Sequence, residues 1–397
     1  MAMAVKRGNA YKITVSVGYD ARGKQIRHHM TWTPDEGMTP KQIEKELERQ
    51  KILFEEDCRN SKVAAGNMKF ETFAEQWFRE YAEAKLKTRS IDRYRQYTAR
   101  VYKAIGHLRM DRITTRTIQK LILNLSEDGV NERTGGKLSP RTVKEYIGFV
   151  SGIFEYAMKQ GVVKENPCKY ATLPSIPHKE LDCFTLEEAQ RFLDLLEDEP
   201  LMWKVFFYLA IYGGFRRGEL FGLEWQDIEF DTGMITIRRI SSYTKARGIF
   251  TDTPKTNGSC RSLKLPQAVI SLLRQYQVHQ TEERLKLGAK WTDTGRLFVT
   301  WDGKLKQPGS AIKWLEQFCK RTGMRQVNIH SFRHLNASLL INSGTDIKTV
   351  SSALGHTQVS TTLNIYAHTF AAAQAKAADA IADTLTIGRK QVVGLER

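Results

Sequence analysis

The chain has 397 residues, and its 61 Lys and Arg residues against 44 Asp and Glu residues give a formal net charge of +17. With 41 % hydrophobic residues it can bury cores of two to four domains, which excludes a disordered polymer and a mini-protein. No apolar run approaches the roughly 18–20 residues that cross a bilayer, and no signal-peptide segment begins the chain. We therefore expect a soluble protein with no membrane partner.

The five cysteines are odd in number, lie far apart and form no C-x-x-C pair. This spacing argues against a disulfide framework and a structural zinc site, and indicates a reducing cytoplasm. A charge of +17 predicts a polyanion as partner. Charge alone does not distinguish DNA from RNA or the ribosome.

The first 27 residues are strongly basic. Residues 11–18 alternate as a strand does, 20–23 carry a turn signal, and 24–32 predict a second strand. Thr39-Pro40 then begins a charged helix that runs to about Asp57. We predict a small β-sheet-plus-helix domain over residues 1–66, whose candidate polyanion contacts are Lys6, Arg7, Lys12, Arg22, Lys24 and Arg27.

Residues 85–120 hold eleven basic residues against two acidic ones. On a helix from about Thr88, apolar residues fall on one side and a basic stripe on the other. A solvated helix face is the alternative interpretation, but such faces usually interleave carboxylates. We therefore predict polyanion contacts from Arg89, Arg93, Arg100 and Lys103.

A helix begins at Ser139-Pro140 and ends near Gly161, and a Pro-containing polar stretch follows it. Thr185-Leu-Glu-Glu188 is a capping box, which is typical of the start of a new domain. Helical apolar runs are expected at 203–212 and 218–225, and mostly helices continue to about residue 384, with strands expected at 234–240, 249–253 and 262–265. The predicted division is a helical domain over 67–173, a linker over 174–183, a main domain over 184–385 and a tail over 386–397.

Phosphoryl chemistry uses either metals held by carboxylates or fixed cations with a covalent nucleophile. The sequence has no P-loop, no H-E-x-x-H and no evident two-metal carboxylate cluster, so we expect no metal and no cofactor. Candidates for the metal-free route lie in four segments: Arg216 and Glu219 after Gly213-Gly214, Lys255 in a Gly-containing turn, His330 and Arg333 one helical turn apart, and His356 followed by Tyr366.

The order Arg, Lys, His-x-x-Arg, His, Tyr resembles the tyrosine recombinases, in the branch of phage and conjugative-transposon integrases. The resemblance covers about residues 180–380, with 23 positions from Arg333 to His356 and 10 from His356 to Tyr366. The first 66 residues resemble the family's arm-binding domain, and about 68–172 its helical core-binding domain. Gly213 stands where Thr is frequent, and Leu335-Asn336 replaces Thr-His or Thr-Phe, but neither departure touches a catalytic position.

This resemblance implies a mainly α catalytic domain with a small β-sheet. Tyr366 would attack phosphorus, giving a 3′-phosphotyrosine and a free 5′-hydroxyl, while Arg216 and Arg333 hold the phosphate oxygens. Lys255 would protonate the leaving oxygen, and His330 would assist proton transfer. His356 would hydrogen-bond the phosphate, and Glu219 would hold the arginine or histidine network in place.

The resemblance also implies an integrase that exchanges strands through a Holliday junction, at work on the nucleoid. Its partners would be double-stranded DNA at core and arm sites, four protomers on that DNA, an excisionase and a host DNA-bending protein. A terminal helix over 371–385 would dock on its own domain or on a neighbour, and both alternatives stay open.

Each residue alone also has a structural interpretation, as a helix cap, a core residue or a surface cation. We assign His334, His368, Arg217 and Arg261 to such structural roles. The alternatives at the level of function are a DNA-binding regulator that keeps the fold without catalysis, a resolvase or invertase, and a type IB topoisomerase.

Overall fold

The computed structural model describes residues 2–19, 24–35, 37–59, 68–177, 182–252, 260–367 and 369–370. Arg22, Lys255, the predicted helix over 371–385 and the tail over 386–397 lie outside these residues. The chain divides into two compact units, residues 1–178 and 179–397, and each is described by itself. No helix in the described ranges is long and apolar enough to span a membrane.

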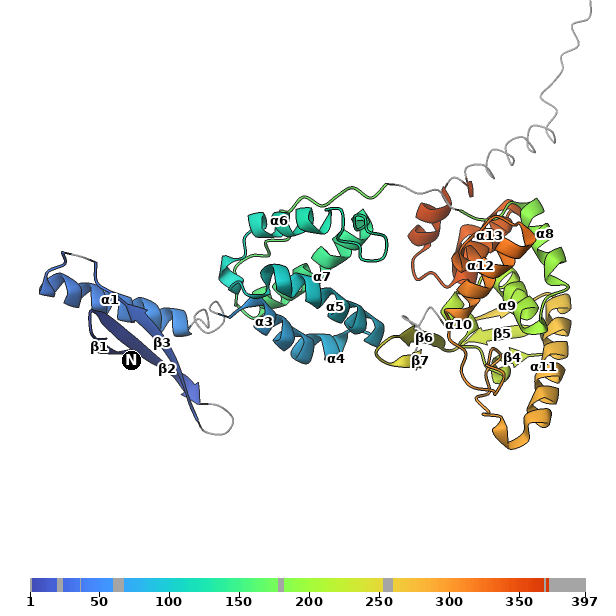
Figure 1. The fold of residues 1–397 in the computed structure, drawn as a ribbon, viewed down its shortest axis with the longest axis horizontal. Coiled ribbons are helices and arrows are strands. Elements are labelled where there is room, and N and C mark those ends of the chain that lie inside the picture. Colours follow the sequence, from blue (N-terminus) through green and yellow to red (C-terminus); the bar gives the residue numbers. More distant parts are fainter. Residues whose placement is uncertain are drawn as a thin grey trace, which may run out of the picture. The chain divides into compact units, whose positions relative to one another are not determined.

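The N-terminal module is an antiparallel sheet in the order β1-β2-β3, with one helix lying along one face (Figure 1). Ile13 and Val15 of the sheet and Phe54 and Cys58 of the helix are buried together. The sequence predicted the second and third strands and missed the first, a short strand with mostly exposed side chains. The elements are β1 (Met3–Arg7), β2 (Ala10–Tyr19), β3 (Gln25–Trp32) and α1 (Pro40–Arg59).

A helical domain follows from residue 68. The apolar stripe of its longest helix, α7, packs Val150 and Phe154 into a core that also holds Trp77. Ser139 caps this helix as the sequence predicted, since its hydroxyl accepts from the Thr142 amide at 3.2 Å. The elements are α3 (Phe70–Trp77), the π-helix η1 (Phe78–Ala82), α4 (Glu83–Lys85), α5 (Thr88–Val101), the π-helix η2 (Tyr102–Gly106), η3 (Met110–Arg112), α6 (Thr115–Leu125) and α7 (Pro140–Lys159).

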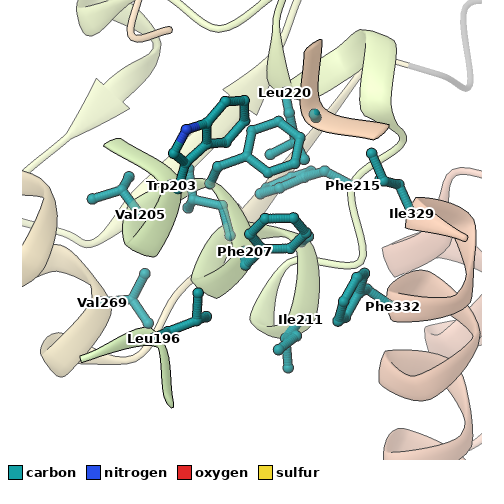
Figure 2. Packing of buried hydrophobic residues seen from close by; sticks show 14 of the residues in the cluster. Leu196, Trp203, Val205, Phe207, Ile211, Phe215, Leu220, Val269, Ile329 and Phe332 are labelled. Carbon is teal, nitrogen blue, oxygen red and sulfur yellow. The ribbon is translucent and has the colours of Figure 1, made fainter. Parts of the chain in front are cut away.

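The C-terminal unit is built around α9, which is buried on nearly every side (Figure 2). Its Phe207 meets Phe332 with ring centroids 5.2 Å apart, which joins α9 to α13. The predicted capping box is present, because Thr185 and Glu188 each bond the other's backbone amide, at 3.2 and 2.9 Å. The helices are α8 (Leu186–Leu196), α9 (Leu201–Tyr212), α10 (Arg217–Leu220), η4 (Trp225–Asp227), α11 (Gln267–Leu287), η6 (Gly288–Lys290), α12 (Ser310–Thr322), α13 (Ile329–Asn342) and α14 (Ile347–Leu354), with further helix over 359–367.

Two small sheets lie beside these helices, one in the order β4-β5-β8 and one made of β6 and β7. The predicted strand over 234–240 is two strands, because Arg239 turns out of the sheet to bond Asp227 at 2.5 Å. Since β7 pairs with β6 while β8 pairs with β5, these two consecutive strands belong to different sheets. The strands are β4 (Ile228–Glu229), β5 (Met234–Ile237), β6 (Ile240–Thr244), β7 (Gly248–Asp252) and β8 (Arg261–Lys264).

The expectation of a continuous helical run over 218–225 is wrong, since α10 ends at Leu220. Gly222 lies against the backbone of the strand region, where an added Cβ would stand 2.5 Å from the Arg239 carbonyl oxygen. The chain therefore turns at Gly222 to bring its backbone against residue 239, and that close approach replaces helix continuation.

Candidate functional site

Three segments far apart in the sequence meet in the C-terminal unit: the turn after α9, the helix α13, and the end of α14. The buried guanidinium of Arg333 joins them, because it donates to the Gly214 carbonyl at 2.8 Å and also to the Leu354 carbonyl. Arg333 is only 1 % exposed. Burial, reinforced by the charge of Arg216, lowers the pKa of Arg333 to about 9.

Arg216 stands at the start of α10, where Gly214 makes a turn that needs a positive φ of 57°. Its Nη1 donates to Glu219 Oε1 at 2.7 Å, and its Nη2 donates to the Gly355 carbonyl at 3.3 Å. Its side chain keeps 37 % of its surface exposed, unlike that of Arg333. The two predicted arginines therefore differ in setting: one is buried, and the other reaches the surface.

Glu219 is buried between two arginines. Besides Arg216, it accepts from Arg261 Nη1 and Nη2 at 3.2 and 3.0 Å. Burial opposes the ionisation of Glu219, but the charge and hydrogen bonds of Arg261, followed by those of Arg216, outweigh it and lower the pKa of Glu219. The carboxylate therefore stays ionised and fixes the guanidinium of Arg216.

The structure brings Arg261 into this site, although its sequence position suggested only a structural role. Arg261 opens β8, its side chain is 7 % exposed, and its Nε donates to the Ala353 carbonyl at 2.7 Å. The Gly355 Cα lies so close that an added Cβ would be 2.9 Å from Arg261 Nη1. No spacing rule within the sequence signals this contact, because it spans 42 positions to Glu219.

The two candidate histidines carry little positive charge at neutral pH. Desolvation comes first, and neighbouring cations add to it, so that the pKa values of His330 and His356 fall to about 4. His356 follows Gly355, which ends α14 in the left-handed conformation, and its Nδ1 lies 2.8 Å from the Thr362 hydroxyl. A neutral imidazole held in this way can donate one hydrogen bond and accept another.

Tyr366 lies in the helix over 359–367 and is 1 % exposed. Its ring packs with Ala337, Val350 and Leu354, and its hydroxyl lies 2.7 Å from Nδ1 of His334. Burial raises the pKa of Tyr366 to about 12, against the opposing charge of Arg333. His334, which the sequence placed among structural histidines, therefore contacts the candidate nucleophile.

Lys255 lies outside the described residues, so no contact is assigned to it. The described chain resumes at Cys260, directly before Arg261 and its bonds to Glu219. In the described ranges no three His, Cys, Asp or Glu side chains are grouped to hold a metal ion. The site that the described residues form is made of arginines, histidines, one carboxylate and one tyrosine.

The basic stripe on α5 is only partly free of carboxylates. Arg93 bonds Glu145 of α7 and donates to the Tyr97 hydroxyl at 2.6 Å. Arg100 donates to Glu132 and to the Val130 carbonyl, both at 2.8 Å. The prediction counted charges along one helix and missed these carboxylates, which come from elsewhere in the fold. Arg89 and Lys103 are both exposed.

The basic residues of the N-terminal sheet divide between its two faces. Strand register places Arg7, Lys12 and Arg27 in rows on the face opposite the α1 side. Lys6 pairs with Tyr11, in the same row as Trp32, and so belongs to the face that α1 covers, although its own side chain is exposed. Lys24 is exposed directly before β3.

Comparisons with known proteins extend over both units. Residues 183–373 match the phage integrase family, and residues 73–173 match the SAM-like domain of phage integrases. A tyrosine recombinase XerC-like protein of Caldanaerobacter subterraneus subsp. tengcongensis is 27 % identical over 96 % of this chain and 97 % of its own length. The ICEBs1 integrase of Bacillus subtilis is 27 % identical over 96 % of this chain and 100 % of its own length.

Solved structures show the same fold. The Tn1549 transposon integrase, in complex with transposon right end DNA, superimposes with a TM-score of 0.64 at 17 % identity, over 80 % of this chain and 100 % of that one. A lambda integrase tetramer bound to a Holliday junction superimposes with a TM-score of 0.55 at 14 % identity, over 89 % of this chain and 95 % of that one. The predicted fold class, a small N-terminal sheet, a helical domain and a mainly α domain with a small sheet, is confirmed.

Proposed function

The chain belongs to the tyrosine recombinases of the phage integrase family, and from this premise we propose that Tyr366 is its nucleophile and that Arg216 and Arg333 hold the scissile phosphate. The enzyme is a site-specific DNA recombinase, an integrase that integrates and excises a mobile element. The observation that carries the residue assignments is the convergence of three distant segments on Arg333, whose guanidinium bonds the carbonyls of Gly214 and Leu354.

The proposed chemistry needs no external energy source. The Tyr366 oxygen attacks phosphorus, the bond to the 5′-oxygen breaks, and the bond energy is kept in a 3′-phosphotyrosine. Arg216 and Arg333 stabilise the charge that builds on the phosphate oxygens, because both guanidinium groups are already held in place before the substrate arrives. Glu219 supports this by fixing Arg216 at 2.7 Å. His356 hydrogen-bonds the phosphate as a neutral donor.

The remaining roles follow from the family resemblance. Lys255 protonates the leaving 5′-oxygen, and His330 assists proton transfer from its place one turn before Arg333 on α13. Religation reverses the same steps on a new 5′-hydroxyl, so the enzyme joins strands without a cofactor.

We propose that the helical domain over 67–173 and the domain over 184–385 bind core-site DNA, and that residues 1–66 bind arm sites. Arg7, Lys12 and Arg27 on the open face of the N-terminal sheet support the second assignment, and exposed Arg89 and Lys103 support the first. The related integrase in complex with transposon end DNA and the related tetramer on a Holliday junction support four protomers on paired sites. An excisionase and a host DNA-bending protein complete the proposed set of partners, and the nucleoid in the cytoplasm is the proposed place of action.

A suicide substrate tests the assignment of the nucleophile. A nick beside the cleavage position lets the short fragment that carries the new 5′-hydroxyl diffuse away, so a covalent protein–DNA adduct accumulates. Tyr366→Phe removes one oxygen and should abolish the adduct while DNA binding stays, and Tyr243→Phe is the control at an exposed tyrosine. An adduct that persists in the Tyr366→Phe variant identifies another nucleophile and refutes the assignment.

Two further variants test the arginines. Arg216→Lys and Arg333→Lys should each be nearly as damaging as the loss of the tyrosine, because a lysine cannot make the forked contact. Cleavage should persist in EDTA, and inhibition by the chelator would contradict the metal-free mechanism. A catalytically inactive regulator on the same fold would form no adduct at all.

A further inference from the structure

His334 makes the one hydrogen bond to the Tyr366 hydroxyl that is found among the described residues, with Nδ1 and the oxygen 2.7 Å apart. The two rings lie with centroids 5.7 Å apart, so the contact holds both side chains in place. His334 is half-buried on α13, next in sequence to Arg333. The histidine therefore already touches the atom that would react.

Each group starts in the protonation state that a proton transfer from the tyrosine to the histidine requires, and the transfer becomes favourable as the bond to phosphorus forms and the phenol oxygen loses its basicity. Burial, followed by the charge of Arg333, lowers the pKa of His334, so its ring is neutral at pH 7 and can accept a proton. Burial raises the pKa of Tyr366 to about 12, so the phenol keeps its proton until a base removes it. The titratable groups around this pair are Arg333, His330 and Cys183, which lies in the chain before α8. The ring centroids of His330 and His334 are 4.8 Å apart.

The neighbouring His330 is placed differently. It lies one turn earlier on the same helix and meets His334 edge to face, and the bond to the tyrosine comes from His334. The family resemblance gave the assistance of proton transfer to His330. The geometry thus separates two histidines that the sequence pattern H-x-x-R-H sets side by side.

We propose that His334 is the base that takes the hydroxyl proton of Tyr366 as this tyrosine attacks phosphorus. The inference rests on the proposed function, because it takes Tyr366 as the nucleophile. In the step, the bond from the Tyr366 oxygen to phosphorus forms, the bond from phosphorus to the 5′-oxygen breaks, and the tyrosine proton moves to Nδ1 of His334. The leaving oxygen receives its own proton from a separate acid. On religation, His334 returns the proton to the tyrosine.

The test combines two substitutions at His334 with two chemical rescues in the full-length protein. His334→Asn puts an amide oxygen near the place of Nδ1, which can accept the hydrogen bond but cannot take the proton. His334→Ala removes both. His279→Asn, at an exposed histidine of α11, is the matched control. Adduct formation is followed on the suicide substrate under single-turnover conditions, together with DNA affinity.

Loss of a general base lowers the rate by about 10²–10⁴-fold. Both His334 variants should lose this much while DNA affinity and the control variant stay unchanged. A fluorinated tyrosine at position 366, whose phenol is more acidic, should restore at least about tenfold of the lost rate in His334→Asn, because less help is needed to remove its proton. A substrate with sulfur at the 5′-bridging position relieves the need for an acid and should restore nothing.

Three results would overturn the proposal. They are cleavage by His334→Asn within about threefold of the wild-type rate, rescue by the sulfur substrate, and no rescue by the acidic tyrosine. Tyr366→Phe is run alongside. An adduct in that variant refutes the nucleophile assignment itself, so the two failures are told apart.

Discussion

We predict that Arg261 stabilises the C-terminal unit through its buried ion pair with Glu219, although we do not assign it to phosphate binding. The perturbation is Arg261→Ala, which removes a bidentate contact to Glu219 and leaves that carboxylate with Arg216 alone. The guanidinium also donates to the Ala353 carbonyl in the last turn of α14, and the variant lacks this bond. Both side chains are buried: 3 % of the Glu219 side chain and 7 % of the Arg261 side chain are exposed.

Removing one partner of a buried ion pair costs about 3–5 kcal/mol, because the other charge stays buried without compensation. Glu219 keeps Arg216 at 2.7 Å, so the lower end, about 3 kcal/mol, is expected. A domain of this size shifts its melting temperature by roughly 2–4 °C per kcal/mol. The C-terminal unit should therefore melt roughly 6–12 °C lower.

Calorimetry of the full-length protein measures this shift. The matched control is Arg274→Ala: Arg274 also pairs with a carboxylate and lies over a phenylalanine ring, but its side chain is 52 % exposed and its partner Asp231 is fully exposed. An exposed pair contributes about 0–1 kcal/mol, so this control should melt within about 4 °C of the wild type. Equal shifts for the two variants would show that burial of the pair does not govern its contribution.

Four further outcomes follow from the same structure. The pKa of Glu219 is lowered in the folded protein, so its stabilising contribution is present above the unfolded value of 4.5 and is lost as the pH falls through the folded value. In denaturant titrations, the difference in unfolding free energy between wild type and Arg261→Ala should therefore shrink below about pH 4.5. The folded pKa values of His330 and His356, about 4, lie below the ordinary 6.5, so these histidines stabilise the fold above pH 6.5 and lose that contribution as the pH falls toward 4. Asparagine at either position should make the free energy of unfolding depend less on pH between 6.5 and 4. Arg89→Ala with Lys103→Ala should lower the salt slope of core-site binding by about 0.9 for each phosphate that is no longer neutralised, measured by titration at several salt concentrations, and an unchanged slope would assign these side chains to a solvated face. Deletion of residues 1–66 should spare core-site cleavage and abolish binding to arm sites, which gel-shift assays with the two kinds of DNA would detect.

The sequence predicted most of the local structure because local signals decide it. The capping box at Thr185 and the cap at Ser139 depend on residues three positions apart, and both are present. The failures come from long-range contacts. The helical run after Gly218 ends early because Gly222 meets the backbone at Arg239, and no local propensity predicts such a meeting.

The same division holds at the site. The arginines, histidines and tyrosine could be predicted from the sequence, because their order and spacing resemble those of the family. The contacts of Arg261 with Glu219 and of His334 with Tyr366 join residues 42 and 32 positions apart, and only the fold brings them together. The prediction for α5 failed for the same reason. It expected a basic stripe almost free of carboxylates, but carboxylates distant in sequence pair with Arg93 and Arg100.

The charges in this site do not balance, and the imbalance is itself informative. Among the described residues, Arg216, Arg261 and Arg333 lie around one carboxylate, Glu219, and the charges of the other two arginines contribute, after burial, to the lowered pKa of Arg333. Backbone carbonyls hold Arg333 in place and supply no full negative charge to offset it. A surplus of buried positive charge is costly in the free protein, and a bound phosphate relieves it. Binding of the scissile phosphate should therefore stabilise the C-terminal unit and raise the pKa of Arg333 toward its ordinary value, because the anion offsets the repulsion among the three guanidinium groups.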